Sequence, residues 1–170
     1  MASTLRLTDL LKRLHDHDVE YVVIGGVAAI MHGSPRTTLD VDVCVVLSEP
    51  NLSRILSMLR GINPRFRMRP DKMPMPDDPD RLRGFNNLCL DTDLGTIDFL
   101  TEISGVGQYA DALRESEVKD VDGFPCRVLT LDALISAKRA ANRLKDRLAI
   151  FELEAIRKRL REQSQKPDQP

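Results

Sequence analysis

The sequence predicts an α/β fold, with a small mixed and mostly antiparallel sheet flanked by helices and followed by a C-terminal helical segment. Two observations predict it: short apolar runs typical of strands occupy the middle of the chain, and apolar residues recur every three or four positions near both ends. At 170 residues the chain has the length of one domain. We assign that domain to residues 1–163 and expect the polar, proline-ended residues 164–170 to be disordered.

Each element follows from a local pattern. Leucines lie on one face of the N-terminal segment, and similar apolar stripes precede Gly61 and follow Thr130, which predicts amphipathic helices. Valine- and isoleucine-rich runs predict strands, and Asp122-Gly123 between two such runs predicts a hairpin turn. The predicted helices are 4–17, 27–31, 49–60, 131–138 and 144–161, and the predicted strands are 21–24, 39–47, 65–69, 85–90, 96–100, 118–121 and 124–129.

Arginine alternates with apolar residues in the predicted edge strand, at Arg65, Arg67 and Arg69. This strip is either a solvated edge that blocks addition of another strand or a contact surface for an acceptor such as RNA, and we favour the solvated edge. The charged, proline-rich residues 70–80 that follow have no periodicity and predict a mobile loop.

The composition argues against several classes of protein. A net charge of −1 is unlike that of a dedicated nucleic-acid-binding protein, which is usually basic. Cys44, Cys89 and Cys126 are widely spaced and form no CxxC pair, so neither a disulfide framework nor a zinc cluster is indicated. No apolar run approaches the ~20 residues that a membrane span needs, and no signal peptide is evident. We therefore expect a cytoplasmic protein that has no membrane partner.

Two carboxylates interrupt a predicted strand that is otherwise rich in valine. Because side chains alternate along a strand, Asp40 and Asp42 point to one face and Val41 and Val43 to the other. Neighbouring carboxylates are costly to bury unless a cation lies between them. Asp98 lies in another apolar run, and a hairpin could bring it opposite the first two acids. The three carboxylates therefore predict a cation site on adjacent strands.

Glycines and basic residues accompany this predicted site. Gly25-Gly26 precedes the strand of the acids and lets the backbone turn sharply and approach a ligand, although a plain strand-to-helix turn also explains it. Arg36 can neutralise the acids, hold a triphosphate or form an ordinary salt bridge with a neighbouring acid. Lys138 falls on the apolar stripe of its helix, so it requires an anion, either Asp98 or a nucleotide phosphate, unless its ammonium group reaches the surface.

Together these motifs resemble those of a known superfamily. A glycine pair, then about a dozen residues, then Asp-x-Asp framed by apolar residues is similar to the signature of DNA polymerase β-type nucleotidyltransferases, with Asp98 in the place of their third acid. Within it, the chain most resembles small bacterial AbiEii-like and related uncharacterised nucleotidyltransferase domains, over roughly residues 20–150. The segment from Lys138 to Asp146 resembles their late Lys…Arg-x-Lys-Asp element. Where those relatives often carry a further acid, this chain has Ala149.

The resemblance implies a metal-dependent enzyme that moves a nucleoside monophosphate from an NTP to a hydroxyl of an unidentified acceptor, which is RNA, a protein or a small molecule. The implied cofactor is Mg²⁺ or Mn²⁺, the hard ions that carboxylate oxygens prefer. The implied site residues are Asp40, Asp42 and Asp98 for metal binding and catalysis, and Gly25, Gly26, Arg36 and Lys138 for nucleotide binding. The alternative is a non-catalytic module of the same fold, an antitoxin or an NTP-sensing regulator, that acts through a protein partner.

Overall fold

The computed structural model describes residues 2–165, with side chains from residue 7 onward. Its helices are α1 (Ala2–Asp16), α2 (Gly25–Met31), α3 (Glu49–Leu59), α4 (Tyr109–Arg114), α5 (Leu131–Ala141) and α6 (Leu144–Ser164), with a 3-10 turn at Pro79–Leu82. Its strands are β1 (Tyr21–Ile24), β2 (Asp40–Val45), β3 (Arg65–Phe66), β4 (Asn87–Thr92), β5 (Gly95–Leu100), β6 (Glu102–Ile103), β7 (Gly107–Gln108), β8 (Ser116–Val121) and β9 (Phe124–Leu129).

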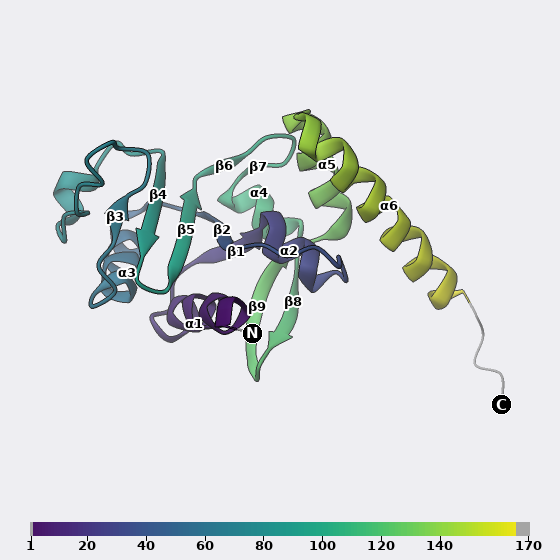
Figure 1. Ribbon diagram of the computed structural model, residues 1–170, viewed down its shortest axis with the longest axis horizontal. Helices are drawn as coiled ribbons and strands as arrows, with labels where there is room; N and C mark the ends of the chain where they lie inside the picture. The colour runs from purple at the N-terminus through teal and green to yellow at the C-terminus, as the bar shows by residue number, and fades with distance from the viewer. Residues whose placement is uncertain (1, 166–170) are drawn as a thin grey trace.

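A mixed seven-stranded sheet, in the order β3-β4-β5-β2-β1-β9-β8, forms the centre of the protein, while β6 and β7 pair separately. The helices flank this sheet, and α6 extends past it toward the C-terminus (Figure 1). Four of the sheet's ladders are antiparallel, and the ladders β2–β5 and β1–β9 are parallel. The predicted α/β class and the mixed, mostly antiparallel sheet are therefore confirmed.

The core forms where the apolar faces of strands and helices meet. Val41 and Val43 of β2 and Ile97 and Phe99 of β5 are fully buried, as their alternation with polar residues predicts. Leu10, Leu11 and Leu14 of α1 are buried with them, and Leu10 is 0% exposed. These residues belong to one continuous cluster that α1, α3 and the sheet share, so the helices hold the central strands in place by burying their inner faces.

Several predicted boundaries need correction. Helix α2 starts at Gly25 rather than near Val27. Strand β3 contains only Arg65 and Phe66, so the predicted strand over 65–69 is too long. Helix α6 continues to Ser164, beyond the predicted end of the domain, and the remainder of the predicted tail, residues 166–170, lies outside the described residues. Within residues 2–165, no helix combines the length and the apolar character that crossing a bilayer requires.

The hairpin of β8 and β9 has the turn that its sequence predicts. Asp122 and Gly123 both have positive φ, 49° and 91°, as a two-residue hairpin loop requires. Strand β9 then leads directly into α5, where the Thr130 side chain caps the helix by accepting a hydrogen bond from the backbone N–H of Ala133. This connection sets where α5 lies beside the central strands.

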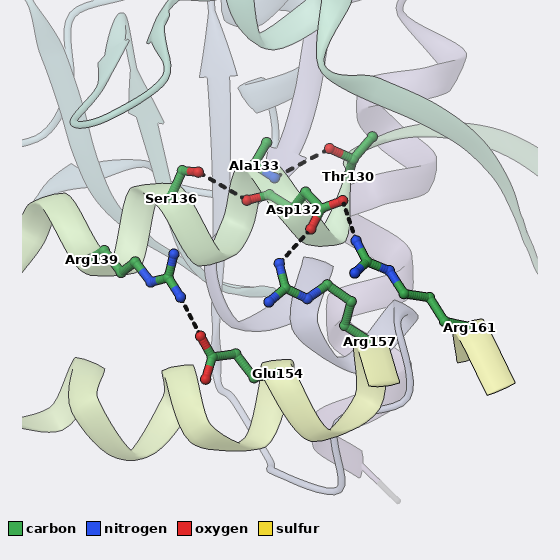
Figure 2. Close-up of polar contacts among 8 residues, drawn as sticks. All are labelled: Thr130, Asp132, Ala133, Ser136, Arg139, Glu154, Arg157 and Arg161. Atoms are coloured by element: carbon green, nitrogen blue, oxygen red, sulfur yellow. Dashed lines mark hydrogen bonds and ion pairs between the residues drawn. The ribbon is translucent and has the colours of Figure 1, made fainter. Parts of the chain in front are cut away.

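Helices α5 and α6 form an antiparallel pair that ion pairs tie together. Figure 2 shows Asp132 of α5 contacting Arg157 and Arg161 of α6, at N–O distances of 2.8 and 3.8 Å. About two turns further along α5, Arg139 pairs with Glu154, which lies about one turn before Arg157 in α6. The pairing brings the N-terminal turn of α6 beside the C-terminal half of α5, and this arrangement positions the polar groups described below.

A buried asparagine, not predicted from the sequence, connects α3 to the strands. Asn51 is 0% exposed. Its Oδ1 accepts a hydrogen bond from the Glu20 N–H at 2.7 Å, and its Nδ2 donates to the carbonyls of Glu20 at 3.0 Å and Val46 at 2.8 Å. One side chain thus satisfies three backbone groups that flank β1 and β2.

We expect Asn51→Ala to destabilise the protein by about 2–4 kcal/mol, because it leaves buried backbone groups without partners. Urea denaturation measures the loss. Ser53→Ala on the exposed face of the same helix is the control and should change the free energy of unfolding by less than about 0.5 kcal/mol. Equal effects of the two variants would show that the Asn51 hydrogen bonds contribute nothing to stability.

Candidate functional site

Three carboxylates lie together on one face of the central sheet. Strands β2 and β5 are parallel and in register, so that Asp42 pairs with Asp98 and Asp40 pairs with Thr96. Asp40 and Asp42 are two residues apart on one strand and share a face. The predicted proximity of Asp98 to Asp40 and Asp42 is therefore confirmed, and the β4–β5 hairpin is the unit that carries Asp98 there.

Arg67 supplies the cation that these carboxylates require in the metal-free protein. Its guanidinium donates a hydrogen bond to Oδ2 of Asp98, and its Nη1 lies 3.9 Å from Oδ2 of Asp40. Arg67 follows β3 directly, and its backbone N–H still donates to the Cys89 carbonyl of β4 at 3.0 Å. Cys89 pairs with Asp98, so strand alternation directs Arg67 to the face of the carboxylates, while Arg65 and Arg69 stay exposed. Arg67 is thus an exception to the predicted solvated arginine strip.

Partial burial and the neighbouring charges raise the pKa values of Asp42 and Asp98. Burial, with the charges of Asp98 and Asp40, raises the pKa of Asp42 to about 6. Burial also raises the pKa of Asp98, although the charge of Arg67 opposes the shift. Oδ1 of Asp98 is buried and has no hydrogen-bond partner among the described residues. A buried, unpartnered carboxylate oxygen beside a second carboxylate is a favourable ligand for a cation.

The two glycines of the predicted site bring α2 close to β2. Gly25 has a φ of +64°, and a Cβ there would overlap the Asp42 carboxylate. A Cβ on Gly26 would lie 3.0 Å from Thr38. Close packing against Asp42 and Thr38 is a sufficient structural reason for both glycines, which agrees with the explanation by a plain strand-to-helix turn. Both glycines also line the pocket that contains the carboxylates.

Arg36 forms an ordinary salt bridge, one of the three alternatives that the sequence left open. Its Nε donates to Oε2 of Glu152 on α6 at 2.6 Å, and the Ser34 hydroxyl donates to the other oxygen of the same carboxylate. The Arg36 hydrogen bond and then that of Ser34 lower the pKa of Glu152. The loop before β2 is thereby fastened to α6, and Arg36 does not neutralise Asp40 or Asp42 directly.

Lys138 does have an anionic partner, but the partner is not Asp98. Its Nζ lies 3.3 Å from Oδ1 of Asp146, whose side chain is 1% exposed. The Arg143 Nε donates to Oδ2 of the same carboxylate at 2.7 Å. Burial opposes ionisation of Asp146, but the hydrogen bonds from Arg143 and the charge of Lys138 outweigh it, so the pKa stays below its ordinary value. Of the two anions that the sequence offered, Asp98 is not the partner of Lys138, because α6 places Asp146 closer; the nucleotide phosphate stays a prediction.

All seven predicted site residues line a single open pocket of about 890 Å³, large enough for a small-molecule ligand. The pocket also includes Arg67, Arg143, Lys145 and Asp146, which the sequence did not single out as site residues by themselves. Carboxylates from β2 and β5 form one part of its wall, and the basic residues of α5 and α6 form another. Charges of both signs in one pocket suit a ligand that binds as a complex of an anion with a metal cation.

The carboxylates fit a hard divalent ion in chemistry, although not in their present positions. Among the described residues, no three His, Cys, Asp or Glu side chains are arranged closely enough to hold a metal ion. Arg67 already contacts two of the three acids. A metal ion would therefore compete with the Arg67 guanidinium for Asp98 and Asp40. The oxygen-only donor set and the unpartnered Asp98 oxygen favour Mg²⁺ or Mn²⁺ as that competitor.

Comparison of the sequence with protein-family models and with curated proteins gave no match.

Removing the Asp42 charge should stabilise the metal-free protein at high pH. Because the pKa of Asp42 is about 6 in the folded protein and about 3.9 in an unfolded chain, the native state loses stability as the pH rises through this interval. We expect Asp42→Asn to add on the order of 2 kcal/mol to the free energy of unfolding at pH 8 and little at pH 4. Urea denaturation in EDTA measures both values. The exposed Asp9→Asn is the control, and an Asp42→Asn variant no more stable than wild type at pH 8 would contradict this account.

Removing Arg67 should have the opposite effect on the metal-free protein and strengthen metal binding. Arg67→Gln leaves Asp98 and Asp40 without their counter-charge, so we expect a loss of about 1–2 kcal/mol, a drop of roughly 2–8 °C in melting temperature. We also expect tighter Mn²⁺ binding, because the competing cation is gone. Melting in EDTA and calorimetric Mn²⁺ titration measure the two effects. Arg65→Gln on the exposed edge is the matched control, and identical behaviour of both variants would refute the competition.

Proposed function

We propose that the chain adopts the nucleotidyltransferase fold and transfers a nucleoside monophosphate from an NTP to a hydroxyl of an acceptor, which is RNA, a protein or a small molecule. The observation that carries this proposal is the register of β2 and β5, which sets Asp42 beside Asp98 within a pocket lined by basic residues. A helix-flanked mixed sheet with three acids on adjacent strands is also what the resemblance of the sequence implies.

In this proposal the three carboxylates have different tasks. Asp40, Asp42 and Asp98 would hold the metal ions, and Asp98 would also act on the attacking hydroxyl. When bound, Mg²⁺ or Mn²⁺ stabilises charge on the phosphate oxygens and lowers the pKa of that hydroxyl. Asp98 Oδ1 has no hydrogen-bond partner among residues 2–165, so this oxygen is free to accept the proton of the hydroxyl.

The basic residues of the pocket bind the triphosphate by exchanging partners. Lys138 and Arg143 pair with Asp146, and Arg36 pairs with Glu152. Each of these ion pairs lines the pocket, and each acid belongs to α6. A triphosphate in the pocket offers the same cations an anion of higher charge, with several oxygens for each guanidinium. Gly25 and Gly26 leave the backbone beside Asp42 free of a Cβ, which lets a phosphate approach.

Thermal melting with each NTP, with and without Mg²⁺, tests the nucleotide site. We expect wild type to melt about 5–10 °C higher when Mg²⁺ is present and one preferred NTP exceeds its dissociation constant a hundredfold. The double variant Asp40→Asn/Asp42→Asn should show no such shift, because it cannot hold the metal ion. Asp9→Asn should respond as wild type does, since its carboxylate lies on the exposed face of α1.

Release of pyrophosphate then separates catalysis from binding. Transfer of a monophosphate must release one pyrophosphate per turnover, and each of the variants Asp40→Asn, Asp42→Asn and Asp98→Asn should abolish it. A metal-dependent NTP shift without pyrophosphate release over a panel of RNA, protein and small-molecule acceptors would favour an NTP-sensing regulator instead. No shift with any NTP would sink the proposed function and favour an interaction module, such as an antitoxin, that acts through a protein partner.

A further inference from the structure

The outer face of α6 carries an apolar stripe that no other part of the described chain covers. Leu144, Leu148 and Phe151 are 81%, 67% and 78% exposed, and the exposed Ala155 continues the stripe. The opposite side of the same helix is buried through Leu153, which is 1% exposed. Figure 1 shows α6 at the periphery of the protein, running past the sheet. A helix that is apolar on both faces normally has a second partner.

The spacing of this stripe is that of a coiled-coil seam. Its four members are separated by four, three and four residues, the heptad alternation of inward-facing positions. Charged residues occupy the flanks of the seam, where interhelical ion pairs form in coiled coils. Lys145 and Glu152 flank it on one side, and Arg147 and Glu154 flank it on the other. On each flank, a basic residue therefore precedes an acidic residue by one heptad.

We propose that α6 is a self-association surface and pairs with α6 of a second copy of this chain in an antiparallel orientation. A two-fold axis between residues 149 and 150 places Leu148 opposite Phe151 of the other copy and Leu144 opposite Ala155 of the other copy. Bulky residues thereby meet in the centre, and each outer leucine meets a small residue. Two-fold symmetry repeats every contact, so four residues build four layers.

The charges of the flanks are complementary in this register. Lys145 of one copy lies beside Glu152 of the other, and Arg147 lies beside Glu154 of the other, each pair occurring twice. Glu152 and Glu154 already pair with Arg36 and Arg139 within the chain. An ionised carboxylate accepts up to about four hydrogen bonds, so each can serve both partners. Their side chains remain 23% and 34% exposed.

The same charges oppose the other arrangements. Shifting the antiparallel register by one heptad toward the C-terminus puts Glu152 opposite Glu152 of the other copy, and shifting it the other way puts Lys145 opposite Lys145. A parallel pair would set Lys158 against Lys158 and Glu162 against Glu162 in the seam. Like charges that face each other are destabilising. A second copy is therefore the occupant that the charge pattern specifies, and the antiparallel register is the one it permits.

Self-association would also reach the candidate site. Lys145 and Glu152 line the pocket as well as one flank of the seam. The second copy's α6 would then lie beside the mouth of the pocket, where it narrows the access of an acceptor without contacting Asp40, Asp42 or Asp98. This inference is independent of the proposed function, because it depends only on the exposed face of α6.

Sedimentation across a concentration series tests the surface with the full chain. We expect wild type to dimerise and Leu148→Glu to be monomeric, because it places a charge in the centre of the seam. The double variant Lys145→Glu/Arg147→Glu makes every flank pair like-charged and should weaken the dimer at least tenfold. The control Arg65→Glu/Arg69→Glu has the same change in charge on the edge of the sheet and should leave the dimer intact. Circular dichroism melting checks that every variant is folded.

Disulfide trapping tests the register. Mixing Leu148→Cys with Phe151→Cys under oxidation should give mostly crosslinks between the two variants, since those positions face each other in the antiparallel pair, whereas a parallel pair would crosslink each variant to itself.

A wild type that stays monomeric up to roughly 1 mM, where association is worth only about −4 kcal/mol, overturns the proposal. A dimer that persists in Leu148→Glu overturns it too, because assembly then uses another surface, and so does trapping of each variant with itself.

Discussion

The parallel pairing of β2 with β5 is the constraint on which the candidate site depends. This register sets Asp42 directly beside Asp98, with Asp40 on the same face, in strands whose other residues build the apolar core. Burial, together with the neighbouring carboxylate charges, raises the pKa of Asp42, and burial raises the pKa of Asp98, so these two acids resist ionisation. Arg67, from the far side of β4, offsets part of the repulsion. The register of β2 and β5 fixes the positions of these carboxylates, so the pocket contains a cluster of like charges whose repulsion destabilises the metal-free fold.

Two acidic residues of α6 form ion pairs with the basic residues of the pocket. Asp146 orders Lys138 and Arg143, and Glu152 orders Arg36. Without these acids, three long basic side chains would lie disordered at the surface or repel one another. The α5–α6 hairpin, closed by Asp132 and its arginine partners, is thus more than a cover for the sheet. It brings preorganised cations to the same pocket as the carboxylates, which lowers the entropic cost of binding an anionic ligand.

Strands, helices and caps that depend on local chemistry could be predicted from the sequence. The β8–β9 turn needs positive φ at two residues, which Asp122 and Gly123 tolerate, and Thr130 caps α5 as its sequence position favours. The acids of β2 share a face because strand geometry has a period of two. The short elements α4, β6 and β7 were not predicted, because two to six residues carry too little periodicity. Arg67 was assigned to a solvated strip because no local pattern shows which strands lie beside it, whereas in the fold it follows Cys89 and Asp98 across the sheet.

The sequence by itself determined the class of the fold, the shared face of Asp40 and Asp42, and the requirement of Lys138 for an anion, since these follow from backbone geometry and the cost of burying charge. Tertiary structure alone decided which groups meet. It paired Lys138 with Asp146 rather than Asp98, and Arg36 with Glu152 rather than the strand acids. Ion pairs between residues distant in the chain depend on how the helices pack on the sheet. That packing is set by the burial of whole apolar faces of helices and strands, and a local sequence pattern does not show which faces meet.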